Sequence, residues 1–173
     1  MANYEFVVVS NTFTVKKEAI DDVSRAIEYF EESYVDGKGN AFIGSYGEQT
    51  YSDDLKVVID KRTNKVLGTY DSGYYSLEDF IEENGYTIEE GLEELSIPSG
   101  EEYSVEDFRE VDFADFIQQN LLEGEYAFIK EVGHEKLRYA CGGGLLITKK
   151  SMKWIDLDRI AEEYVEKEKG LKP

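Results

Sequence analysis

The sequence of 173 residues has one cysteine, two prolines and no long apolar run. The single thiol, Cys141, cannot form an internal disulfide, so we expect a reducing, cytoplasmic compartment. No apolar run approaches the ~20 residues that cross a bilayer. The first ten residues lack a basic region before their short apolar run, which predicts a first strand and not a signal peptide. Internal repeats and low-complexity tracts are also absent.

Positive charge is almost missing from one segment. Between Asp71 and Glu125 the chain carries 18 Asp and Glu residues and a single cation, Arg109, a net charge of −17 out of −19. Residues 1–70 carry −4 and residues 126–173 carry +2, so the acidity is one block between nearly neutral flanks. Because Lys and Arg bind phosphate backbones and anionic membranes, we expect neither direct nucleic-acid binding nor membrane binding. The block predicts a basic partner surface instead.

The remaining composition is that of a folded protein. Hydrophobic residues make up 41% of the chain and aromatic residues 13%, which argues against intrinsic disorder despite the net charge. The length suffices for one domain, or two small ones, with a real core. The 13 tyrosines suit half-buried sheets and protein interfaces, and we expect most of them to fill strands.

Residues 1–70 combine strand and helix patterns. A helix is predicted from Val15 to about Ser33, capped by Thr14, because apolar residues recur at spacings of three and four. This stripe consists of Ile20, Val23, Ile27, Phe30 and Tyr34. Predicted strands are Tyr4 to Ser10, Ala41 to Tyr46, Leu55 to Asp60 and Val66 to Tyr70, the last two paired. The result is a β-α-β-β-β unit.

The acidic segment 71–125 carries several helix-start signals. Full or near capping boxes begin at Ser76, Thr87 and Ser104. The predicted short helices are broken at Gly85 and at residues 97–100, and a fourth runs from about Asp112 to Leu122 and stops at Gly124.

In the first part of residues 126–173, apolar and polar residues alternate with a period of two, which is typical of strands. Four strands are predicted at Glu125 to Glu131, Lys136 to Cys141, Leu145 to Thr148 and Met152 to Ile155, with turns at 132–135, 142–144 and 149–151. A last helix after Asp156 places on one side Ile160, Ala161, Tyr164 and Val165. We therefore expect an α+β fold of two antiparallel β-sheet units with flanking helices, joined by the acidic helical stretch. The units are 1–70, 71–125 and 126–173, or together one compact domain.

The acidic segment is the candidate partner-binding surface. Carboxylates four residues apart on a helix lie about 6 Å apart along its axis, and DNA presents one phosphate per ~3.4 Å of each strand. The candidate residues are Glu78, Asp79, Glu82, Glu83, Glu89, Glu90, Glu93, Glu94, Glu101, Glu102, Glu106 and Asp107, with the aromatic anchors Tyr74, Tyr75, Tyr86 and Tyr103. Interleaved apolar residues should face inward: Leu77, Phe80, Ile81, Ile88, Leu92 and Leu95. The alternative is a merely solvated acidic surface.

The sequence gives only weak indications of metal binding. Residues 36–40 superficially resemble a calcium loop, but Lys38, Ala41 and Gly47 occupy ligand or turn positions, so we interpret the segment as a turn. Asp156 and Asp158 fit helix capping. No designed metal site and no cofactor site is expected.

Catalytic residues are not assigned either. Cys141 and His134 are close in sequence, but no third residue is placed to orient them, and we expect a buried thiol and an exposed turn histidine. The glycines 142–144 lack the Lys and Ser/Thr of a phosphate loop, so a flexible turn is predicted.

In composition and size the chain resembles the DNA-mimicking proteins that phages and mobile elements use against restriction or CRISPR systems. The resemblance implies a non-enzymatic inhibitor of a basic nucleic-acid-binding protein, a nuclease or a CRISPR or restriction component. Alternatives are an immunity protein against a basic nuclease toxin, a hydrolase acting on a small anionic or nucleotide substrate, and an adaptor whose sheet edges or C-terminal helix bind a partner. The identity of the target and the oligomeric state stay open.

Overall fold

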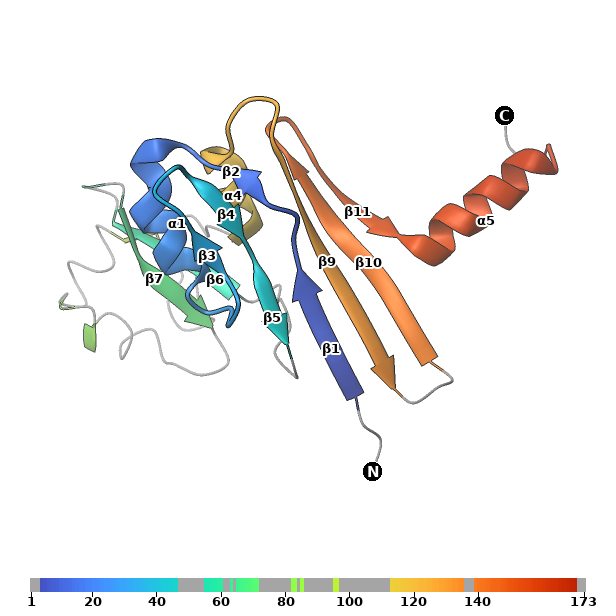
Figure 1. Cartoon of the computed structure of the whole chain (residues 1–173), viewed down its shortest axis with the longest axis horizontal. Coiled ribbons are helices and arrows are strands. Elements are labelled where there is room, and N and C mark those ends of the chain that lie inside the picture. Colours follow the sequence, from blue (N-terminus) through green and yellow to red (C-terminus); the bar gives the residue numbers. More distant parts are fainter. Residues whose placement is uncertain are drawn as a thin grey trace.

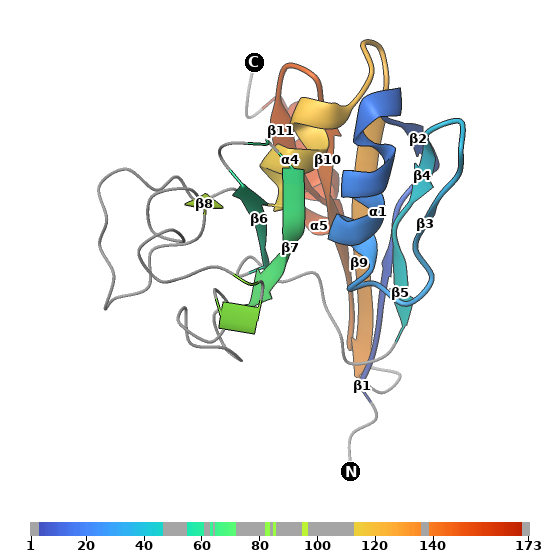
Figure 2. The ribbon, with the colours of Figure 1, turned by 90° about the vertical axis from the view of Figure 1, so that its left-hand side faces the viewer.

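The fold is α+β, with helices packed on separate antiparallel sheets, as expected from the sequence. The computed structural model describes residues 4–46, 55–60, 63, 65–71, 82–83, 85, 95–96, 113–135 and 139–170. Figures 1 and 2 show the long twisted sheet with helices and further strands packed on one side, and the C-terminal helix projecting beyond it.

The long sheet has five strands, in the order β11 (Met152–Asp156), β10 (Tyr139–Thr148), β9 (Tyr126–Glu135), β1 (Tyr4–Val9) and β5 (Gly44–Tyr46). All neighbours in it are antiparallel. Strand β1 pairs with β9 over six residues, with Val8 opposite Glu131. Segments from both flanks of the acidic block therefore share one sheet.

Two small sheets complete the strand structure. One has the order β2 (Phe13–Thr14), β4 (Asn40–Phe42) and β3 (Tyr34–Val35), and the other β7 (Lys65–Asp71), β6 (Leu55–Asp60) and β8 (Leu95–Ser96). The predicted β6–β7 hairpin is confirmed. The prediction of Leu95 on a helix is wrong, because Leu95 pairs with Asp60 as part of β8. Pairing with a distant strand, which the local helical spacing does not reveal, decides the conformation of Leu95.

The first helix is shorter than predicted. A 3₁₀ turn, η1 (Lys17–Ala19), leads into α1 (Ile20–Ile27). Thr14 does not cap this helix, because Thr14 belongs to β2 and its carbonyl accepts a hydrogen bond from the Leu122 amide at 3.2 Å. Val15 forms a bridge with Leu121. Backbone pairing with the segment after α4 (Phe113–Asn120) thus delays the start of the helix.

The predicted strand from Ala41 to Tyr46 is split into β4 and β5 at Ile43. The Ile43 amide donates to the Ser10 hydroxyl at 2.8 Å, and the Ile43 carbonyl accepts from the Ser10 amide at 2.8 Å. Both backbone groups of Ile43 are therefore satisfied where the chain passes from a small sheet to the long one.

The core lies between α1, α4 and the inner face of the long sheet. The predicted stripe on α1 is buried at Val23 and Ile27 and continues to Phe30. The Phe30 ring lies 5.5 Å from the Phe113 ring of α4. Tyr34, predicted on the same stripe, is instead half-exposed and belongs to β3. Helix α4 itself confirms the predicted helix before Gly124, whose φ is +86°.

Three long strands replace the four predicted after the acidic segment. Strands β9 and β10 run through residues 132–135 and 142–144, so the turns predicted there are wrong. The three glycines leave room for neighbours: a Cβ on Gly144 would lie 2.5 Å from Phe128 Cε2, and one on Gly143 3.2 Å from Trp154 Cζ2. Glycine within a strand marks such a close approach. The turn at 149–151 is confirmed, as is the final helix, α5 (Leu157–Glu168).

Candidate functional site

Two members of the predicted partner-binding surface are among the described residues. Glu82 and Glu83 are helical and exposed. The Gly85 amide donates to the Glu82 carbonyl at 2.9 Å, and the φ of +78° at Gly85 suits glycine, at the predicted helix break. The other predicted members lie outside the described residues: Glu78, Asp79, Glu89, Glu90, Glu93, Glu94, Glu101, Glu102, Glu106, Asp107, Tyr74, Tyr75, Tyr86 and Tyr103.

The acidic segment is attached to the folded body at three described places. It begins in β7, which ends at Asp71, and it ends after α4, whose Phe113, Phe116 and Ile117 are buried. Between them, β8 pairs with β6. Figure 2 shows β6, β7 and α4 on the same side of the long sheet. These contacts place the attachment points of the segment on the core side of the molecule.

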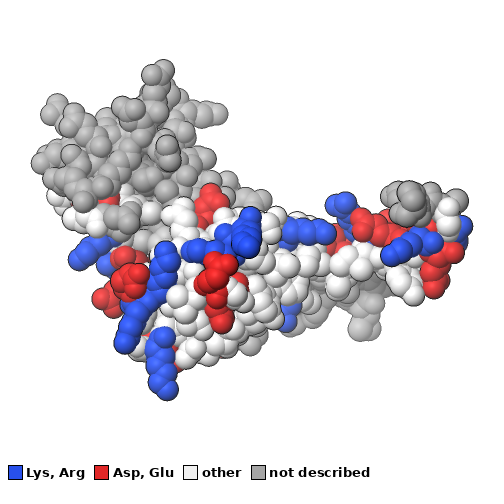
Figure 3. All heavy atoms as spheres, turned by 90° about the horizontal axis from the view of Figure 1, so that it is seen from above, with Lys and Arg blue, Asp and Glu red and all other residues white. Residues whose placement is uncertain are grey.

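Charges of both signs lie beside each other on the described body. Figure 3 shows Lys and Arg side chains interspersed with Asp and Glu on one face. Two ion pairs join such neighbours on helices, Arg25 with Asp22 at 3.1 Å and Arg159 with Glu163 at 2.9 Å. Such mixing is typical of a solvated surface. It contrasts with the single sign of charge in the acidic segment.

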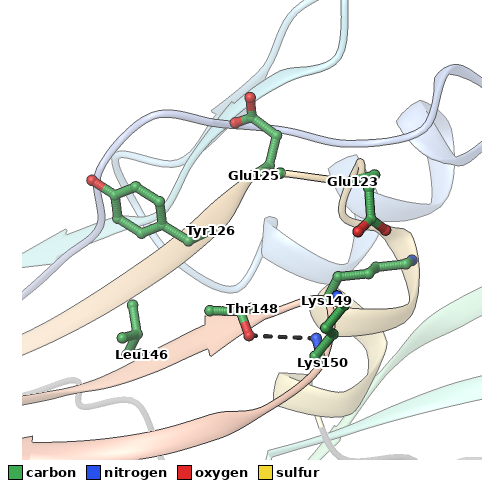
Figure 4. Close-up of a pocket in the computed structure, with 8 residues that line it drawn as sticks. Glu123, Glu125, Tyr126, Leu146, Thr148, Lys149 and Lys150 are labelled. Atoms are coloured by element: carbon green, nitrogen blue, oxygen red, sulfur yellow. Dashed lines mark hydrogen bonds between the residues drawn. The ribbon is translucent and has the colours of Figure 1, made fainter.

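A depression of about 550 Å³, open to solvent, lies beside the β10–β11 turn (Figure 4). Two of its charged groups, Lys149 and Glu125, make hydrogen bonds that stabilise the fold. The Lys149 ammonium donates to the carbonyls of Gln119 at 2.8 Å and Gln118 at 3.4 Å, at the C-terminal end of α4, where a cation complements the helix dipole. Partial burial lowers the pKa of Lys149, and the nearby Lys16 lowers it further. The Glu125 carboxylate accepts from the Thr14 amide at 3.1 Å.

The segment 36–40 forms the predicted turn. The Asp36 carboxylate accepts from the Asn40 side chain at 2.8 Å, the Asn40 amide at 3.0 Å and the Lys38 amide at 2.8 Å. These bonds, led by the one from the Asn40 side chain, hold the pKa of Asp36 below its usual value. The capping role predicted for Asp156 is confirmed, because its carboxylate accepts from the Arg159 amide at 2.9 Å.

His134 and Cys141 both lie within strands. The turn position predicted for His134 is wrong, because His134 belongs to β9 and is paired with Ala140. Cys141 belongs to β10 and pairs with Gly133, one step along the same ladder.

Within the described ranges, no group of three or more His, Cys, Asp or Glu side chains is arranged to hold a metal ion. Over the same residues, every helix is too short or too polar to cross a membrane.

Helix α5 and the outer face of the long sheet, which is the face turned away from α1 and α4, form a second candidate surface. The one-sided apolar stripe of α5 was predicted, but the exposure of that stripe to solvent was not. Leu157 and Tyr164 are each 62% exposed, and α5 has no buried residue. The outer face of the long sheet is also uncovered at Tyr126 and Val132. Periodicity shows that a stripe exists, and only the position of the helix shows whether the stripe is buried.

No protein-family model, curated protein or solved structure matches the chain. Function is therefore inferred from the charge pattern and the described surfaces.

Proposed function

We propose that the protein is a non-enzymatic inhibitor that presents its acidic segment to the basic groove of a nucleic-acid-binding protein, such as a restriction or CRISPR nuclease. One observation carries the proposal. Residues 71–125 hold 18 carboxylates and one cation, while the flanks are nearly neutral. Generally acidic proteins spread their charge over the chain, and here 17 of the 19 net negative charges fall in one segment.

Electrostatics explains how such a segment would inhibit. A basic groove attracts phosphates through Lys and Arg, and a dense row of carboxylates offers the same sign of charge at a similar spacing. Complementary charge accelerates encounter and disfavours wrong partners. The inhibitor would then compete with nucleic acid for one site, without changing either molecule chemically.

The described contacts support presentation of the segment by the folded body. Strand β7 leads into it, β8 pairs with β6 within it, and the buried residues of α4 close it. Attachment at several points lowers the conformational entropy that is lost on binding. The exposed carboxylates of Glu82 and Glu83 point to the same use. Lys149 and Glu125, two of the charged groups that line the depression, are engaged in structural hydrogen bonds.

The test begins with capture of basic proteins on the immobilised full chain, followed by a DNA-cleavage assay with each captured nuclease. Restriction endonucleases, CRISPR nucleases and basic nuclease toxins form the reference panel. We expect inhibition that falls as salt rises, because exposed charges are screened over about 8 Å at physiological ionic strength. Excess DNA should relieve the inhibition.

A matched pair of charge variants isolates the acidic segment. The test variant replaces Glu89, Glu90, Glu93 and Glu94 by Gln, and should lose most of the inhibition. The control neutralises the same number of exposed acids elsewhere, at Glu18, Asp21, Glu28 and Glu31, and should inhibit normally. Equal inhibition by both variants would show that the acidic segment is not the binding surface. Turnover of a nucleotide or nucleic acid that is lost in Cys141→Ser or His134→Ala would overturn the non-enzymatic assignment.

A further inference from the structure

The outer face of the long sheet, the one turned away from α1 and α4, is apolar and lacks a covering layer of described residues. Along β9, Ala127 and Ile129 are buried in the core, whereas Tyr126 and Val132 on the other face are about half exposed. Residues of the outer face, assigned by the same alternation and the strand register, are Val7, Val9, Tyr126, Phe128, Val132, Leu146 and Ile155.

Helix α5 carries a second uncovered apolar surface. Its apolar stripe, spaced at three and four residues, consists of Leu157, Ile160, Ala161, Tyr164 and Val165. All five are exposed, Ile160 to 48% and Val165 to 45%. Figures 1 and 3 show α5 projecting from the body as an arm. An amphipathic helix normally gains its stability by burying such a stripe.

The junction between β11 and α5 keeps the arm away from its own sheet. Strand β11 ends at Asp156 and α5 begins at Leu157, so no loop residue separates them. The Asp156 carboxylate accepts from the Arg159 amide and holds the first turn in place. Leu157 is the point of contact with the sheet, with its Cδ1 3.3 Å from the Cβ position of Gly142. The direct junction therefore leaves no loop that would let α5 fold back onto its own outer face.

We infer that α5 of one copy packs across the outer face of a second copy, and reciprocally, in a two-fold symmetric dimer. Such exchange is isologous, because the same two surfaces meet twice. The dimensions agree: a helix of 12 residues is about 18 Å long, and four strands at ~4.8 Å spacing span roughly 14 Å between their axes. A stable interface buries about 1,200–2,000 Å² in total, and four surfaces contribute to this one because the helix stripe and the sheet face are each used twice.

Charge complementarity also favours a second copy. The charged side chains described on the outer face are Lys130 and Lys153. One flank of the α5 stripe carries Asp158 and Glu162, which are exposed and suited to meet these lysines. The same carboxylates disfavour an anionic membrane as the occupant. This inference is independent of the proposed function, because none of the residues that form the proposed interface belongs to the acidic segment.

Sedimentation velocity of the full chain over a range of concentrations tests the dimer. We expect twice the chain mass at micromolar concentration. Replacing Ile160 and Tyr164 by Ser should weaken the dimer at least 30-fold. Val132→Ser, on the sheet face that receives the helix, should also weaken the dimer when it is introduced alone. Replacing Tyr34 and Leu122 by Ser removes comparably exposed apolar groups elsewhere, and should leave the dimer intact. Far-UV circular dichroism checks that each variant stays folded.

Charge reversal supplies a test that does not remove apolar area. Lys130→Glu with Lys153→Glu should weaken the dimer about tenfold, and adding Asp158→Lys with Glu162→Lys should restore it. A chain that stays monomeric at 100 µM would overturn the inference. So would a dimer whose dissociation constant is unchanged by both the Ile160/Tyr164 and the Val132 substitutions.

Discussion

The side chain of Asp22 on α1 accepts a hydrogen bond of 3.1 Å from the backbone amide of Val66 on β7. Arg25, one turn further along the helix, donates to the Val66 carbonyl and pairs with Asp22 at 3.1 Å. Both backbone groups of a buried edge residue are thereby satisfied by one helical ion pair. Edge strands are usually protected from further pairing, and here α1 performs that task.

Asp22→Ala should destabilise the protein by about 1–2 kcal/mol, because the Val66 amide would lose its acceptor while the residue stays buried. Urea unfolding followed by circular dichroism measures the change. Asp21→Ala is the matched control: Asp21 is the exposed neighbour in the same helical turn, and its loss should cost only about 0.5 kcal/mol through the helix dipole. Similar losses for the two variants would contradict the role of Asp22.

Gly144→Ala should destabilise the protein by roughly 1–3 kcal/mol through overpacking. The new Cβ would lie 2.5 Å from Phe128 Cε2 and 2.7 Å from the Ile129 carbonyl oxygen. Gly68→Ala, also within a strand, meets nothing within 4 Å and should be neutral or slightly stabilising. Thermal unfolding of both variants distinguishes them. Equal melting temperatures would show that the sheet adjusts freely at Gly144.

Lys149→Met should cost about 0.5–1 kcal/mol, because the carbonyls of Gln118 and Gln119 would lose a charged donor at the end of α4. Lys150→Met at the neighbouring exposed position is the control and should change stability little. Urea unfolding of the two variants gives the comparison. If Lys150→Met proved the more costly, the capping role of Lys149 would be refuted.

The turn at Asp36 should lose stability in acid. Hydrogen bonds, led by those from Asn40, lower the pKa of Asp36 in the folded state below its ordinary value of 3.8. The stabilising contribution is therefore complete above the unfolded pKa and is lost as pH falls through the lower folded pKa. NMR titration of the Asp36 carboxyl measures this. Asn40→Ala should raise its pKa toward 3.8, and Lys38→Ala should raise it less, because the Lys38 charge is the smallest of its causes.

The local pattern of residues was sufficient to predict many of the helices and strands. Strand β1, the β6–β7 hairpin, α4 and α5 follow from runs of one period bounded by turn or capping residues. The errors arose where a distant partner decided the outcome. Val15 is extended because it bridges to Leu121, more than 100 positions away in the sequence. Gly143 and Gly144 lie within β10 because they pair with β9 and β11, and a Cβ at either position would meet atoms of those strands, which no local rule reveals.

The two candidate surfaces also differ in how far they can be recognised from the sequence. The acidic segment is visible in the sequence because charge is a property of composition, and Glu82 and Glu83 are its described members. The exposed stripe of α5 could not be recognised as a surface, because an amphipathic helix looks the same whether it is buried or projecting.

The sequence by itself determined the separation of charge, the α+β class and the periods of most strands and helices, since each depends on neighbouring residues. Only the tertiary structure decided that β1 joins β9 across the acidic segment, that three glycines lie within one strand, and that α5 leaves its sheet without a loop. These features depend on contacts between residues far apart in the chain. Local preferences are weak compared with the packing and hydrogen bonding that such contacts provide.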